Sequence, residues 1–195
     1  MAALPVWAAA AVRGDTFWVR VGIADHFGWA IAVTASTDFE VVDRRRIELI
    51  EAGVTAAPIH YDGHNYDVAG MTALVTEVRK SVGRAASAAL DALPEAVTSI
   101  SLRGWPPDFP SDIAVQLRSP YEARADAIMY RQVLADLAVA RGWKVHFYDA
   151  KTVEAEAAGT LGARADEVLY GPRATLGPPW TKDHRIALAA TIVGG

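Results

Sequence analysis

Four aspartates stand where their carboxylates are able to bind a metal ion. Asp25 ends an apolar strand, and Asp149 directly follows another. Asp126 shares a helical line with apolar residues, so it borders a buried face and needs a partner or a metal there. Asp183 lies in the first turn of the last helix and points inward. Converging carboxylate oxygens can hold two hard divalent cations, which clamp a scissile phosphate and activate water.

Each acid also has an ordinary structural interpretation. Asp25 suits the turn that follows its strand, and Asp149 suits a loop or a helix cap. Asp126 can pair with an arginine or a tyrosine inside the protein. Asp183 is favoured near a helix N-terminus by the helix dipole. Residue types and spacing leave both interpretations open for all four.

Two neighbours of Asp183 and one loop add further candidates. Lys182 and His184 are placed to steady the charge of a hydrolytic transition state. In the polar loop that follows the third strand, alternate residues would form a possible transition-metal triad if the backbone were extended. These are His60, Asp62 and His64. An ordinary surface loop is the commoner role of such a segment.

Five apolar stretches have the pattern of β-strands. They are residues 17–24, 29–35, 39–50, 97–102 and 143–148. Short turns join the first three, which predicts an antiparallel meander. Helical spacing follows over 70–92, 120–140, 151–158 and 182–193. A meander followed by alternating helices and strands predicts an α/β fold, with a five-stranded mixed sheet and helices on both faces.

This order of elements resembles the ribonuclease H-like superfamily, which includes Holliday-junction resolvases, over about residues 17–193. The resemblance implies a carboxylate at the end of the first strand, here Asp25, and one on the final helix, here Asp183. It also implies one after the fourth strand, where this chain has Leu102-Arg103-Gly104. Asp126 or Asp149 is then the substitute. The expected ligands of Mg²⁺ or Mn²⁺ are Asp25, Asp183 and Asp126.

The residues before the last helix carry a second resemblance. They read Gly177-Pro178-Pro179-Trp180-Thr181-Lys182-Asp183. This ending is similar to that of a group of uncharacterised bacterial proteins with the pattern GPPW-x-KD. The similarity marks a family and implies no activity.

Composition limits the class of protein. The 195 residues are 52% hydrophobic and 22% charged, as in a globular protein. That length predicts one domain over 16–195 after a loosely ordered lead-in at 1–15. The absence of cysteine excludes disulfides and thiolate chemistry and fits a reducing cytoplasm. Residues 1–12 lack a basic start and are too short to span a bilayer, so no membrane association is expected.

Two functions from different classes remain nearly level. One is a divalent-metal-dependent nuclease that acts on nucleic-acid phosphodiesters. The formal net charge of the chain, −4, argues against a broad basic face for nucleic acid. The other is a non-catalytic module that binds a protein partner, or a second copy, through the Pro- and Trp-rich loops at 104–110 and 171–180. A phosphotransferase of the actin-like class is disfavoured, because His26-Phe27-Gly28 is a poor phosphate hairpin.

Overall fold

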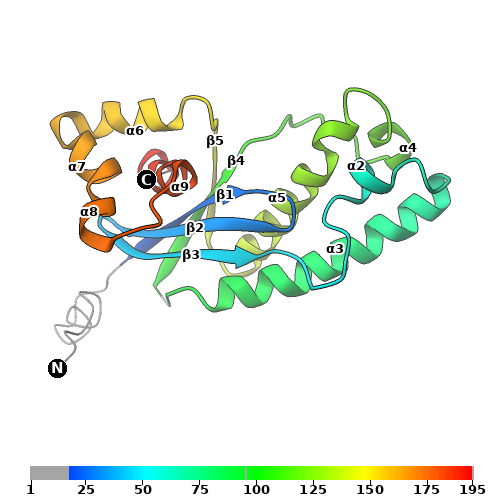
Figure 1. The fold of residues 1–195 in the computed structure, drawn as a ribbon, viewed down its shortest axis with the longest axis horizontal. Helices are drawn as coiled ribbons and strands as arrows, with labels where there is room; N and C mark the ends of the chain where they lie inside the picture. Colours follow the sequence, from blue (N-terminus) through cyan, green and yellow to red (C-terminus); the bar gives the residue numbers. More distant parts are fainter. Residues whose placement is uncertain (1–17, 95, 195) are drawn as a thin grey trace.

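The computed structural model describes residues 18–94 and 96–194, so the predicted lead-in at 1–15 lies outside the described residues. Five strands form one sheet in the order β3-β2-β1-β4-β5 (Figure 1). Their bounds are β1 Val19–Asp25, β2 Trp29–Ser36, β3 Val41–Glu48, β4 Val97–Arg103 and β5 Lys144–Tyr148. The first three are antiparallel, whereas β4 is parallel to both β1 and β5. The predicted mixed sheet is confirmed.

Long helices cover both faces of this sheet (Figure 1). One face packs against α3 (Val68–Asp91) and α5 (Glu122–Ala140). The other packs against α9 (Lys182–Val193), and α6 (Val153–Leu161) packs against α9. This is the α/β arrangement, with helices on both faces of a mixed sheet, that the order of elements predicts. In the described part of the chain, none of the helices combines the length and the apolar composition that crossing a bilayer requires.

Several short helices were not predicted from the sequence. They are α2 (Pro58–Asp62), α4 (Ile113–Gln116), η1 (Gly162–Arg164), α7 (Ala165–Tyr170) and α8 (Pro172–Leu176). Each is too short for a hydrophobic stripe to show the helical period, so turn and loop residues dominate its sequence. The predicted loops at 51–67 and around 171–180 therefore contain helical turns.

The central strand β1 is buried on both faces, and its alternation decides which helix each side chain meets. Val19, Val21 and Ile23 belong to the core under α3 and α5, whereas Ala24 belongs to the core under α9. At Gly22, an added Cβ would lie 1.8 Å from the carbonyl oxygen of Ala187 in α9. Only glycine therefore permits this close approach of helix and strand.

The GPPW segment is fixed to the sheet from β3. The guanidinium of Arg44 donates from Nη1 to the carbonyls of Gly177 and Pro179, and from Nη2 to that of Leu176. The Trp180 indole donates to the carbonyl oxygen of Leu169 at 2.8 Å. These contacts hold the chain that leads into α9, so Arg44 has a structural role here.

Candidate functional site

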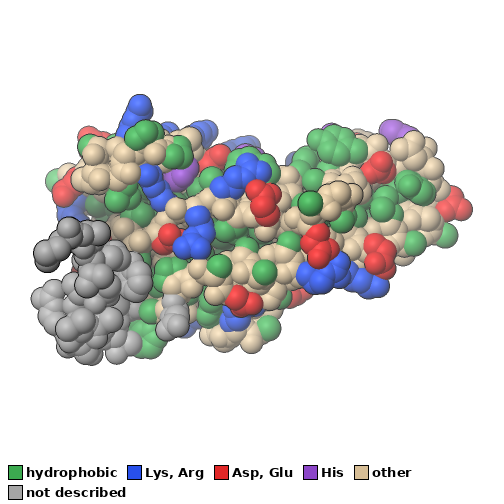
Figure 2. Space-filling view, turned by 60° about the horizontal axis from the view of Figure 1, so that its bottom comes forward, with side chains coloured by type: hydrophobic (Ala, Val, Ile, Leu, Met, Phe, Trp, Pro, Cys, Tyr) green, Lys and Arg blue, Asp and Glu red, His purple; other side chains and the backbone are tan. Residues whose placement is uncertain are grey.

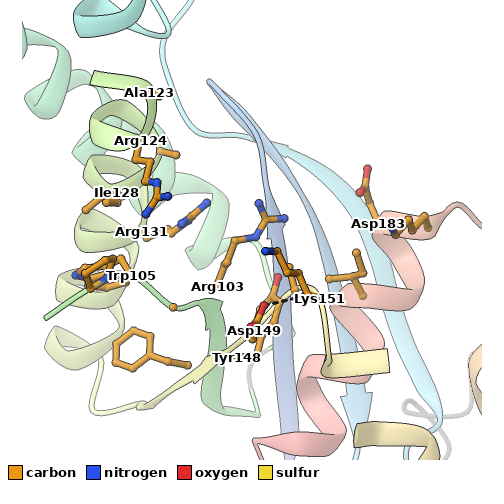
Figure 3. A pocket seen from close by; sticks show the side chains of 17 residues that line it. Arg103, Trp105, Ala123, Arg124, Ile128, Arg131, Tyr148, Asp149, Lys151 and Asp183 are labelled. Atoms are coloured by element: carbon orange, nitrogen blue, oxygen red, sulfur yellow. Dashed lines mark hydrogen bonds between the residues drawn. The ribbon is translucent and has the colours of Figure 1, made fainter. Parts of the chain in front are cut away.

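A pocket of about 980 Å³ opens where the carboxyl ends of β4 and β5 meet the first turns of α5 and α9 (Figure 3). Side chains from both faces of the sheet reach this edge. Ligand sites in α/β proteins commonly lie beyond the carboxyl ends of parallel strands. The position therefore makes the pocket the leading candidate for a binding site among the described residues.

The pocket lining is rich in cationic side chains. They are Arg103, Arg124, Arg131, Lys151 and Lys182. Two acids, Asp149 and Asp183, share the lining. Because the whole chain carries a formal charge of −4, this excess of positive charge is local to the pocket.

The fold explains how these cations come together. Arg103 is the last residue of β4, and Lys151 follows β5 in its loop. Arg124 and Arg131 are seven residues apart in α5, which is two helical turns, so they project from the same side of the helix. Lys182 is the first residue of α9. Four elements distant in sequence thus supply the lining.

Asp25 is paired with Arg131 beside this pocket. Asp25 points to the same side of β1 as Val21 and Ile23, which is the side that α5 and its Arg131 cover. The Nε of Arg131 donates to Oδ2 of Asp25 at 2.8 Å, and the two side chains are 9% and 2% exposed. The other oxygen, Oδ1, is buried and has no hydrogen-bond partner among the described residues. The carboxylate predicted to bind metal is therefore neutralised by a guanidinium.

Tyr148 and Arg103 complete the cluster of polar side chains around Asp25. Burial raises the pKa of the Tyr148 hydroxyl, and the negative charge of Asp25 raises it further, whereas Arg103 and Arg131 act in the opposite direction. The hydroxyl stays protonated and donates to the carbonyl oxygen of Ile23 at 2.7 Å. The Nε of Arg103 is buried and lacks a partner among the described residues.

Asp126 does not join Asp25 and Asp183. Its two carboxylate oxygens accept hydrogen bonds from the backbone N–H groups of Ile59, at 3.2 Å, and His60, at 2.9 Å. These are free donors of the first turn of α2. Asp126 therefore caps a helix from a distant part of the chain, and burial raises the pKa of its carboxyl. The ligand set of Asp25, Asp183 and Asp126 is not assembled.

The other predicted residues divide between the pocket and the framework. Asp149 lines the pocket, and its Oδ1 accepts from the Lys151 backbone at 2.8 Å. Asp183 lines it too, with Oδ2 at 3.1 Å from Nε2 of His26. Lys182 is also in the lining.

His184 is buried and serves as part of the α9 cap instead of facing the pocket. Its Nδ1 accepts from the backbone N–H of Thr181 at 3.2 Å and lies 2.8 Å from the Thr181 hydroxyl. These contacts give His184 a structural role, and its predicted role in steadying a transition state stays a prediction. Burial, and next the charge of Arg44, lower the pKa of His184, which favours the neutral ring that can accept these bonds.

The possible metal triad of His60, Asp62 and His64 required an extended backbone, and the structure does not have one there. His60 and Asp62 lie in the helical turn α2, so they do not share a side as they would in a strand. The Asp62 carboxylate accepts a hydrogen bond from the hydroxyl of Thr55 at 2.9 Å. The ring of His60 packs against Tyr61, with centroids 5.1 Å apart.

The residues around Asp25 do not fit a centre for two divalent cations. Its unpaired Oδ1 is the one feature that a cation would satisfy. Such cations need a surplus of oxygen ligands, whereas here Arg131 binds Oδ2 and Arg103 adds a second permanent positive charge to the cluster. In the described residues, no three His, Asp or Glu side chains gather as ligands. This set of side chains therefore does not support a metal-dependent step.

Sequence reasoning missed most of the cations that line the pocket. At the end of the fourth strand, attention falls on the carboxylate that is missing there and not on Arg103. A charged residue at the end of a buried strand is itself a signal of a functional site. The spacing of Arg124 and Arg131 is a second signal, because it puts two arginines on a side of the helix that also borders the core. Lys151 follows a parallel strand, where ligand-binding loops lie.

No family model matches this chain, and no curated protein sequence matches it. The solved structures that are similar to it include two of RuvC. RuvC of T. thermophilus in complex with a Holliday junction substrate has a TM-score of 0.46 and 15% identity, over 90% of each chain. A structure of Thermus thermophilus RuvC has a TM-score of 0.46 and 14% identity, over 89% of this chain and 90% of that one.

Proposed function

We propose that this chain is a non-catalytic nucleic-acid-binding domain that holds phosphate groups in its basic pocket. The observation that carries the proposal is the set of cations at the carboxyl edge of the sheet, beside an aspartate already paired with Arg131. The pocket thus offers donors for phosphate oxygens where hydrolysis would require carboxylates.

Guanidinium groups favour phosphate as the ligand. Arginine presents a planar fork of donors that matches phosphate oxygens, and its charge is permanent. On the face shown in Figure 2, basic and acidic side chains are interspersed instead of forming one basic patch. Binding should therefore concentrate on the pocket.

An aromatic pair beside the cations favours a nucleic acid over a simple anion. Trp105 and Phe147 both line the pocket, and their rings meet edge to face with centroids 4.8 Å apart. Phe147 is 56% exposed although it is a large apolar residue. Bases stack on exposed aromatic rings in many single-strand-binding proteins. Cations and aromatic rings together match the two parts of a nucleotide.

The state of Asp25 supports a role without hydrolysis. A general base or metal ligand needs a free carboxylate oxygen pointing at the substrate. Here one oxygen is bonded to Arg131, and both are buried. Freeing the aspartate would leave a buried guanidinium without its partner, which is costly.

The test measures binding and cleavage of single-stranded DNA and RNA. Fluorescence anisotropy at several salt concentrations would compare the wild type with an Arg124→Gln, Lys151→Gln double variant and with Lys80→Gln. Lys80 is an exposed lysine on α3 that pairs with Glu77, so it controls for the loss of one positive charge away from the pocket. We expect weaker binding and a smaller salt dependence only in the double variant, by about one unit of slope for each lost phosphate contact.

Two outcomes would overturn the proposal. Cleavage that requires Mg²⁺ or Mn²⁺ and disappears in Asp25→Asn would instead support the predicted nuclease. Failure to bind either nucleic acid would remove the proposal and leave the predicted protein-binding module to be tested by its oligomeric state and partners.

A further inference from the structure

We infer that the pocket takes a terminal phosphate, the phosphomonoester at the end of a nucleic-acid strand, in preference to an internal phosphodiester. This inference rests on the proposed function and names the ligand of the same site. The geometry of the cations, their number and how firmly they are held all favour this ligand.

The cations surround one space instead of forming a row. In Figure 3, Arg131 from α5, Arg103 from β4 and Lys151 from the loop after β5 reach into the same region. A protein that tracks a continuous strand needs a groove in which cations follow successive phosphates. Cations that converge from separate elements instead suit one compact anion with several free oxygens.

The charge balance also favours a dianion. The five cations of the lining face two acids of the lining and the adjacent Asp25, which leaves an excess of two positive charges. A phosphomonoester carries about 1.5 to 2 negative charges at neutral pH, whereas an internal phosphodiester carries one. The terminal group therefore neutralises the pocket more completely.

Two of the arginines are positioned before any ligand arrives. Arg131 is fixed by its hydrogen bond to Asp25 and is 8% exposed. The Nε of Arg103 is buried and unpaired among the described residues. Side chains that are already ordered lose less entropy on binding, which raises affinity for a ligand that matches their geometry.

The experiment compares one single-stranded DNA oligonucleotide in three forms, with a 5′-phosphate, with a 3′-phosphate or with hydroxyl groups at both ends. Each carries a fluorophore away from the end under test. We expect the wild type to bind at least one phosphorylated form about tenfold more tightly than the hydroxyl form. Lys151→Gln and Arg124→Gln should each reduce that ratio, whereas Lys80→Gln should preserve it.

The possible results test the strand-end inference and the proposed function separately. Equal affinity for all three forms would overturn the inference and leave nucleic-acid binding intact. No binding of any form would overturn the proposed function itself. Adenosine monophosphate serves as a competitor. If it displaced the phosphorylated strand at the strand's own concentration, the site would be one for free nucleotides, and the strand-end assignment would be wrong.

Discussion

The guanidinium of Arg131 and the carboxylate of Asp25 form a hydrogen-bonded ion pair that is more than nine-tenths buried, with Nε 2.8 Å from Oδ2. The pair joins α5 to the end of β1, residues 106 positions apart in the chain. Because Arg131 also lines the pocket, the pair connects the packing of the sheet edge with the candidate site.

Removing one member of this pair should destabilise the protein strongly. Arg131→Met leaves the buried Asp25 charge without a counterion, so we expect the free energy of unfolding to fall by about 3–5 kcal/mol. Adding Asp25→Asn to that variant should recover part of the loss, since the stranded charge is gone. Urea unfolding followed by circular dichroism measures both. A loss under about 1 kcal/mol in Arg131→Met would contradict the buried pair.

The close packing of α9 on β1 should tolerate no side chain at residue 22. Gly22→Ala places a Cβ against the Ala187 carbonyl oxygen, and the resulting shift of α9 should cost about 3 kcal/mol or more. Gly83→Ala is the control, because an added Cβ there has no neighbour within 4 Å. That change lies inside α3 and should stabilise by up to about 1 kcal/mol. Similar thermal midpoints for the two variants would contradict the contact.

The chain from α8 to α9 should loosen when its clamp is removed. Arg44→Met deletes the donors to the carbonyls of Leu176, Gly177 and Pro179. We expect trypsin to cleave faster after Arg173, in α8, as the segment opens locally. Arg46→Met is the matched control on the same strand, because Arg46 makes an exposed ion pair with Glu48. Equal cleavage rates in the two variants would show that Arg44 does not hold the segment.

His184 should make the protein less stable in mild acid. Burial, followed by the charge of Arg44, lowers the pKa of its ring below the ordinary 6.5. The folded state therefore favours the neutral ring, and the unfolded state binds a proton at higher pH. Stability from this group is present above the unfolded pKa and is lost as pH falls through the folded one.

The corresponding measurement compares unfolding free energies at about pH 7.5 and about pH 5 for the wild type and His184→Gln. Glutamine at this third helical position can still accept from the Thr181 backbone, as in an ordinary capping box. We expect the wild type to lose more stability on acidification than the variant. His146, whose pKa is also lowered by burial, is present in both proteins and cancels in the comparison. An identical pH dependence would refute the role of His184.

The strands and long helices could be predicted because they depend on local patterns. The alternation that predicts a strand over 97–102 corresponds to β4 at Val97–Arg103. The predicted helix over 70–92 corresponds to α3, whose N-cap Asp67 accepts from the backbone of Gly70. The third strand is shorter than predicted, since Phe39 lies in a turn with a φ of 69°.

The partners of the acids could not be predicted, because they depend on tertiary contacts. Helical spacing correctly places Asp126 at a buried face, but nothing local indicates that its carboxylate caps α2. The same limit applies to Asp25. Its position at the end of a strand is equally consistent with a metal ligand and with an ion pair. The ion pair with Arg131 forms only because α5 packs beside the end of β1.

The central place of β1 in the sheet has a consequence for synthesis on the ribosome. This strand emerges early and can pair at once with β2, but its other edge waits for β4, and one of its faces waits for α9, at the far end of the described chain. Until then, the meander presents an open strand edge and apolar surface to the surroundings, which are the features that promote misassociation of nascent chains. Completion of the fold, and with it of the pocket, is thus postponed until the last helix has been released.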